Sequence, residues 1–126
     1  MQTVGFIDRE KFRPIAEDII TDEVILTDER VQHIVDRRGT AFLDKYGRYF
    51  PLVLSEPDYI FPDERKNTAI VCKVVGEGKG AVNLILRLAV EGEDPTYKNS
   101  ILTAIQEGQR RFSQRLRNNV PVYRRS

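Results

Sequence analysis

His33 is the only histidine of this chain, and it lies between two arginines at helical spacing. Arg30, His33 and Arg37 are separated by three and four residues, the spacings that place side chains above one another on one face of a helix. An imidazole titrates near pH ~6.5 and can exchange a proton under neutral conditions. Guanidinium groups bind phosphate oxygens. These residues therefore predict a site that holds a phosphate and moves a proton.

The chemistry that such residues fit is cleavage of RNA by its own 2′-hydroxyl group. The reaction needs a base for the 2′-hydroxyl proton, an acid for the departing 5′-oxygen, and positive charge near the phosphorane. We predict that His33 transfers a proton and that Thr103 donates a hydrogen bond to a non-bridging oxygen. The predicted catalytic set is His33, Arg37, Lys73, Arg87 and Thr103, and the predicted substrate-binding set is Arg30, Arg38, Arg110 and Arg111.

Each of these residues also has an ordinary structural interpretation. A lone histidine on a helix is often a surface residue, and charged side chains on an exposed sheet face are often simply solvated. Glu107 could act as an acid or a base, and it equally fits a salt bridge. Tyr59 and Tyr97 offer surfaces on which bases could stack.

The sequence lacks the residues that other common sites require. One histidine and one cysteine supply no zinc-binding set, and no acidic segment matches a calcium-binding loop. Residues 76–80 are glycine-rich but lack the spacing and the following helix of a phosphate-binding loop, so they predict a hairpin turn. The Gly-x-Ser-x-Gly motif of many acyl-transfer enzymes does not occur. We therefore expect neither a metal ion nor a cofactor.

The length and composition are those of a one-domain globular protein. The chain has 126 residues, of which 40% are hydrophobic and 31% charged. No apolar segment is long enough to cross a bilayer and no export signal is visible, so we expect no membrane association. Cys72 lies in an apolar segment and cannot form an internal disulfide. We expect it in the core of a cytoplasmic protein.

The charge is distributed unevenly. Residues 98–126 contain seven basic residues and one acidic residue, a net charge of +6, whereas residues 1–97 contain thirteen basic and eighteen acidic residues, a net charge of −5. A basic C-terminal segment suits a polyanion such as RNA, and it equally suits a solvated helix face and tail.

The apolar patterns predict an α+β fold. Residues 1–21 form an irregular or partly helical lead-in, 23–26 a short strand or extended link, 27–39 a helix between Thr27 and Gly39, and 51–55 a second short helix. Strands are expected at 58–61, 68–75, 81–91 and 99–106, followed by an amphipathic helix over 108–118. Short N-terminal helices, a meander of three to four antiparallel strands and a C-terminal helix are therefore expected.

A pairing of these strands can be predicted from the apolar pattern. A hairpin centred on Gly78 pairs Cys72 with Leu84, and the next turn places Thr103 opposite Arg87. This register places Lys73, Arg87 and Thr103 on one polar surface, and a slip of one residue would exchange the two faces.

Several short motifs are similar to those of a known group of nucleases. The segment 24–38, VILTDERVQHIVDRR, resembles the opening helix of phage- and mobile-element-associated nucleases of the barnase/EndoU/colicin/RelE-like (BECR) superfamily. There, a His-Ile pair is commonly followed by a basic residue and a second histidine. Further similarities are EPDYI at 56–60 and NSILT at 99–103, in the last strand. The resemblance covers roughly residues 22–118, and residues 119–126 remain as a basic tail.

The resemblance implies a single BECR-like domain over residues 1–126 and a set of active-site elements. These map onto His33, Arg37 and Thr103, with Lys73 or Arg87 as the cation of the sheet. Arg38 stands where the family often has its second histidine, which removes one acid/base partner.

The implied function is a toxin-like, metal-independent endoribonuclease that cleaves through a 2′,3′-cyclic phosphate. Its partners would be RNA and a protein inhibitor or immunity protein. Two alternatives remain open: a non-catalytic RNA-binding module, and an accessory protein of a phage or mobile element that binds proteins through its sheet. The oligomeric state is left open as well.

Overall fold

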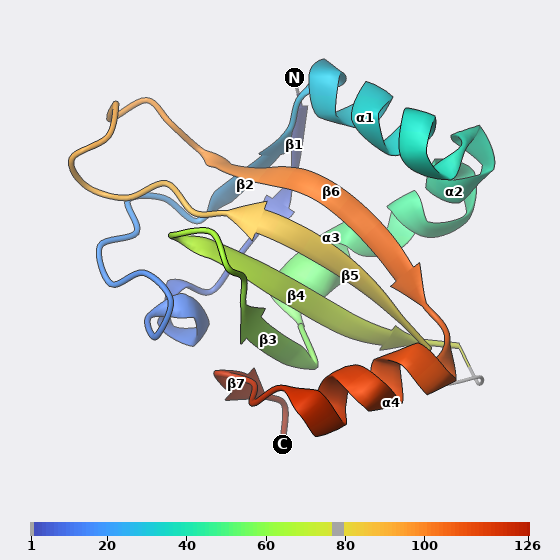
Figure 1. The fold of residues 1–126 in the computed structure, drawn as a ribbon. Helices are drawn as coiled ribbons and strands as arrows, with labels where there is room; N and C mark the ends of the chain where they lie inside the picture. The colour runs from blue at the N-terminus through green and yellow to red at the C-terminus, as the bar shows by residue number, and fades with distance from the viewer. Residues whose placement is uncertain (1, 77–79) are drawn as a thin grey trace.

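A mixed, seven-stranded sheet forms the centre of the protein in the computed structural model, which describes residues 2–76 and 80–126 (Figure 1). The strands lie in the order β1-β2-β6-β5-β4-β3-β7. Their bounds are β1 Gln2–Phe6, β2 Glu23–Leu26, β3 Tyr59–Pro62, β4 Thr68–Val75, β5 Gly80–Arg87, β6 Asn99–Glu107 and β7 Tyr123–Arg124. The α-helices are α1 Asp28–Arg38, α2 Thr40–Tyr46, α3 Phe50–Ser55 and α4 Gln109–Asn118, and Arg9–Phe12 and Gly47–Tyr49 are 3-10 helices.

The predicted architecture, an α+β meander of three to four strands preceded by short helices, is wrong. Helices and strands are combined, but β1 precedes every α-helix, and β2 pairs with β6 in parallel. The lead-in segment contributes β1, and the basic tail contributes β7, which pairs with β3. These edge strands are short and lie against partners distant in sequence, so no local alternation marks them.

The residues predicted to begin and end α1 do so. Its N-cap residue is Thr27, whose hydroxyl accepts a hydrogen bond from the backbone N–H of Arg30 at 3.2 Å. Gly39 follows the helix with a φ of 87°, a conformation that favours glycine, and its N–H donates to the carbonyl of Val35. Pro51 lies in the first turn of α3, where its missing N–H costs no hydrogen bond.

Helices cover the two faces of the sheet unequally. One face, which we call the α3 face, packs Val71, Leu84 and Leu86 of the strands against Val53 and Leu54 of α3, and all five side chains are fully buried. The other face, which we call the α4 face, packs Cys72, Phe61 and Ala81 against Phe112 of α4. Because α4 is short, it covers only part of that face (Figure 1).

The predicted register of the meander is wrong. Cys72 is opposite Asn83 and not Leu84, and Thr103 is opposite Ile85 and not Arg87. A bulge at Leu102 shifts the β5–β6 pairing once more. The turn centred on Gly78 falls in residues 77–79, outside the described residues. The apolar pattern could not select the register, because β4 and β5 are largely buried on both faces.

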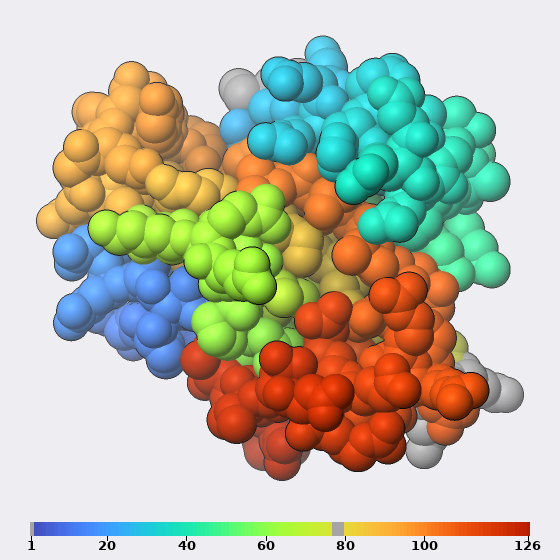
Figure 2. All heavy atoms as spheres, viewed as in Figure 1, coloured from blue at the N-terminus to red at the C-terminus, as the bar shows by residue number. Residues whose placement is uncertain are grey.

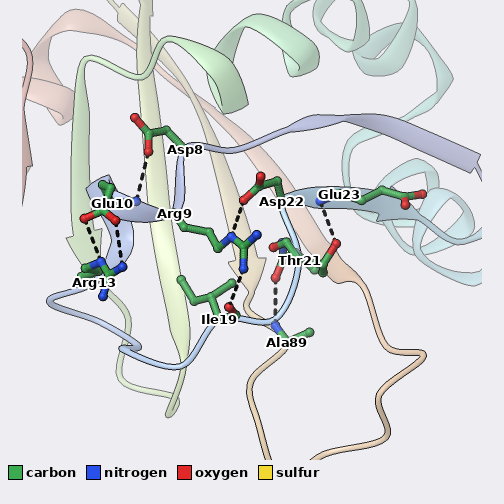
Figure 3. A network of polar contacts seen from close by, with 10 residues as sticks. Asp8, Arg9, Glu10, Arg13, Ile19, Thr21, Asp22, Glu23 and Ala89 are labelled. Atoms are coloured by element: carbon green, nitrogen blue, oxygen red, sulfur yellow. Dashed lines mark hydrogen bonds and ion pairs between the residues drawn. The ribbon is translucent and has the colours of Figure 1, made fainter.

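The segment between β1 and β2 supports the loop between β5 and β6. Arg9 donates a hydrogen bond to the carboxylate of Asp22 at 2.6 Å and another to the carbonyl of Ile19 at 3.0 Å (Figure 3). Ile19 in turn forms an isolated antiparallel bridge with Val90. The lead-in segment is therefore ordered by contacts that lie far apart in the sequence.

Candidate functional site

The uncovered part of the α4 face is a groove between α1 and α4. Figure 2 shows a hollow in the surface there, with atoms of β5 and β6 at its base. Ile70, Thr103 and Ile105 are half-buried in this part of the face, around the buried Ile85. We call this hollow the α4-face groove.

The stripe of Arg30, His33 and Arg37 lies on one flank of α1, beside the residue that this helix buries in the α3-face core. Ile34 is fully buried and Val31 packs on that core. At about 100° per residue, the stripe falls on the opposite flank of Ile34 from Val31, and so on the rim of the α4-face groove. His33 and Arg30 are half-buried, and Arg37 is exposed. Among the described residues, no hydrogen bond or ion pair engages these three side chains.

Arg38 lies at the edge of β6 that β2 leaves unpaired. Its Nε donates a long hydrogen bond, 3.4 Å, to the carbonyl oxygen of Ala104. The contact leaves the positive charge without a carboxylate partner in the described part of the chain. Arg38 falls on the same flank of α1 as Val31, about 100° around the helix from Arg37, so the structure does not bring this predicted substrate-binding residue to the stripe.

A polar cluster that the sequence did not reveal lies at the α4 end of the groove. Arg115 donates to both carboxylate oxygens of Glu107, at 2.8 and 3.1 Å, and Asn83 donates to the same carboxylate at 2.5 Å. Asn83 is fully buried, and its Oδ1 has no partner among the described residues. The available signals were Asn83 within an apolar run of β5 and an arginine eight positions after Glu107.

Electrostatics keep Glu107 ionised in this cluster. Burial by itself would raise the pKa of the carboxyl, but the hydrogen bonds and charge of Arg115, the Asn83 amide and the charge of Arg111 together lower the pKa below its ordinary value. The same pairing raises the pKa of Arg115. The pair fixes a guanidinium group beside the groove.

The two predicted substrate-binding residues of α4, Arg110 and Arg111, lie on different sides of the helix. Phe112 is buried against the sheet, and Arg111 lies on the same flank of it as Arg115. Arg110 is about 200° from Phe112 around the helix and points to solvent. Only Arg111 is close enough to lower the pKa of Glu107.

Lys73 does not belong to this surface, so the predicted grouping of Lys73 with Arg87 and Thr103 is wrong. It is opposite Val82 on the α3 face, where it is 8% exposed. Its Nζ donates to the carbonyl of Glu56 at 2.8 Å and lies 3.6 Å from the carboxylate of Asp58. The register differs from the predicted one by one residue, which moves the side chain to the other face.

Arg87 and Thr103 do share the α4 face, but only Thr103 has a polar group that is left without a partner in the described structure. Arg87 forms an ion pair with Glu93 at 2.5 Å and donates to the carbonyl of Leu88. Its charge is therefore neutralised within the β5–β6 loop. Thr103 is half-buried, and its hydroxyl makes no side-chain hydrogen bond within residues 2–76 and 80–126.

The comparisons with known proteins identify no family for this chain. No protein-family model, no curated protein and no solved structure matches the chain. Within the part of the chain that the structure describes, no three or more histidine, cysteine, aspartate or glutamate side chains gather as a metal site would require. None of the described helices combines the length and apolar character of a membrane span.

Proposed function

We propose that this protein is an endoribonuclease that binds single-stranded RNA in the α4-face groove and cleaves it without a metal ion. The observation that carries the proposal is the placement of Arg30, Arg37 and Arg111, which lack a carboxylate hydrogen-bond partner in the described structure, on the two rims of one groove. Unpaired cations on facing rims attract a polyanion and hold its phosphates.

In this proposal His33 removes the proton from the 2′-hydroxyl group. The 2′-oxygen then attacks the adjacent phosphorus, the bond from phosphorus to the 5′-oxygen breaks, and that oxygen takes a proton from solvent. The products end in a 2′,3′-cyclic phosphate and a 5′-hydroxyl group. Arg37 and Arg111 balance the charge that develops on the phosphorane, and Thr103 donates a hydrogen bond to a non-bridging oxygen.

The similarity of residues 24–38 to the BECR nucleases supports this function. It also supports a toxin-like role in a phage or mobile element, in the cytoplasm, with a protein inhibitor or immunity protein as a partner. We therefore include membership of the BECR superfamily in the proposal, on the basis of these short motifs.

An RNA-cleavage assay in EDTA tests the proposal. Wild type should convert a single-stranded RNA into products with 2′,3′-cyclic phosphate ends, and a substrate with 2′-O-methyl groups should stay intact. His33→Ala should lower the rate by about 100-fold or more, the usual contribution of a general base. Gln32→Ala is the matched control, since Gln32 lies on the outer side of α1 and bonds Asp36. Full activity of His33→Ala, or cleavage only with added metal, would reject the mechanism.

A second candidate is an RNA-binding module without turnover. Two observations favour it: Arg38 stands in place of a second histidine, which would be a general acid, and Glu93 neutralises Arg87, which would otherwise be a further cation for the phosphorane. Salt-sensitive RNA binding with no cleavage, unchanged in His33→Ala, would identify this function.

A further inference from the structure

A mostly apolar hollow opens at the β5–β6 loop end of the α4-face groove. Its volume is about 490 Å³, and it is lined by Ile25, Ser100, Arg87, Leu88, Ala89 and residues 93 and 96–98 of the loop. Arg87 is opposite Ser100 and Ser100 is opposite Ile25, so these three residues form one row across β5, β6 and β2. The hollow is therefore built on the same sheet face as the groove.

The hollow is preformed, because hydrogen bonds hold the β5–β6 loop in place. The buried side chain of Asn99 accepts a hydrogen bond from the N–H of Ala89 and donates one to the carbonyl of Thr21. The carboxylate of Glu93 accepts hydrogen bonds from the N–H of Val90 and from Arg87. A ligand would find this site in place and would not have to order the loop.

The lining matches a flat aromatic ring with polar edges. Tyr97 is 53% exposed at the hollow, and its ring stacks on no other aromatic ring or cation among the described residues. The hydroxyl of Ser100, which makes no side-chain hydrogen bond there, can donate or accept a hydrogen bond at the edge of a ring. Aliphatic lining from Ile25 and Ala89 suits the face of such a ring.

The hollow lies within one nucleotide of the proposed cleavage point. Arg87 is two residues along β5 from Ile85, which is opposite Thr103. At 3.4 Å per residue, this separation is about 7 Å. A base in the hollow would therefore belong to a nucleotide next to the phosphate that Thr103 contacts.

We infer that this hollow binds one nucleobase of the RNA strand, with Tyr97 as the stacking surface. The inference rests on the proposed function, because it assigns a base-binding subsite to the groove that holds the phosphate. It makes Tyr97 and Ser100 substrate-binding residues for a base next to the cleaved phosphate. Stacking accepts any base, and the Ser100 hydroxyl adds a preference at the edge of the ring.

The test measures binding of a fluorescent oligoribonucleotide in which 2′-O-methyl groups block cleavage. The same strand is also made with a single abasic position, moved along it one nucleotide at a time. Tyr97→Ala should weaken binding of the intact strand by about 5- to 140-fold, the usual contribution of one stacked base. Tyr97→Phe should bind like wild type, since the ring is kept. Leu52→Ala, which changes an exposed apolar residue of α3 on the other face, is the control.

The abasic strands distinguish stacking from general binding. In a strand too short to shift along the groove, one abasic position should weaken wild-type binding as much as Tyr97→Ala does, and that position should cause no further loss in Tyr97→Ala. Equal losses at every position, or an unchanged affinity of Tyr97→Ala for the intact strand, would overturn the base subsite. Cleavage assays on Tyr97→Ala distinguish a wrong base subsite from a wrong proposed function. Cleavage with unaltered KM would reject the subsite alone, whereas wild type that neither binds nor cleaves RNA would reject both.

Discussion

Arg115 donates two hydrogen bonds to the carboxylate of Glu107, at 2.8 and 3.1 Å, and this bidentate pair joins α4 to the end of β6. Glu107 is 3% exposed and the Arg115 side chain is 23% exposed, so the carboxylate of the pair is largely withdrawn from water. A guanidinium held by both oxygens of one carboxylate has little rotational freedom. The pair thus orients the flank of α4 that carries Arg111 toward the groove.

Replacement of Glu107 by glutamine should destabilise the protein. Glu107→Gln keeps the size of the side chain but leaves Arg115 without its charged partner. We expect the free energy of unfolding to fall by about 2 kcal/mol, within the range for hydrogen bonds to charged groups. Urea denaturation measures the change. Glu64→Gln, at an exposed position, is the control and should change little, and an equal loss in both variants would contradict the role of the pair.

The same pair makes stability depend on acidity. The pKa of Glu107 is lowered in the folded state, so its contribution is fully present above about pH 4.5 and is lost as the pH falls through the lower folded-state pKa. The difference in unfolding free energy between wild type and Glu107→Gln should therefore shrink below pH 4.5. Denaturation curves at a series of pH values measure it. A constant difference down to the most acidic pH would show that Glu107 is not responsible.

The neighbouring arginines of α4 should differ in their effect on RNA binding. Arg111→Gln removes a cation on the groove flank and should weaken binding while lowering the slope of log K against log salt by about one. Arg110→Gln removes an equal charge from the solvent side and should have a smaller effect. Fluorescence anisotropy over a range of salt concentrations measures both slopes. Equal slopes for the two variants would place the RNA elsewhere.

Lys73 should stabilise the fold without taking part in RNA cleavage. Lys73→Met removes the hydrogen bond to the carbonyl of Glu56 and the ion pair with Asp58. We expect a loss of about 1–2 kcal/mol in unfolding free energy, with kcat/KM of the folded protein unchanged. Denaturation and cleavage are measured on the same preparation. A stable variant with a large loss of activity would show that Lys73 does take part in cleavage.

The thiol of Cys72 should be unreactive in the folded protein. Its side chain is fully buried, and burial raises the pKa of the thiol far above its ordinary value. A thiol reagent at mildly alkaline pH should therefore label the chain only after urea is added, and the labelling rate should follow unfolding. Rapid labelling of the native protein would show that the region around β4 opens.

Local features of this protein could be predicted from its sequence because each depends on a few adjacent residues. Thr27, the acidic residues after it and Gly39 predict the bounds of α1, and this prediction is confirmed. Alternating and β-branched residues predict β4 and most of β5 and β6, and Phe112 with Leu116 predicts α4. The burial of Cys72 is also confirmed.

The stripe of Arg30, His33 and Arg37 on one helix face follows from helical periodicity alone, since its spacing is a property of α1. The tertiary structure decided which surface that stripe meets, because the pairing of β4, β5 and β6 is set by packing on both faces and by the bulge at Leu102. A shift of one residue moved Lys73 to the α3 face, while distant contacts brought Asn83, Glu107 and Arg115 together. Periodicity acts within one element, whereas a sheet face and a groove exist only once separate elements have packed.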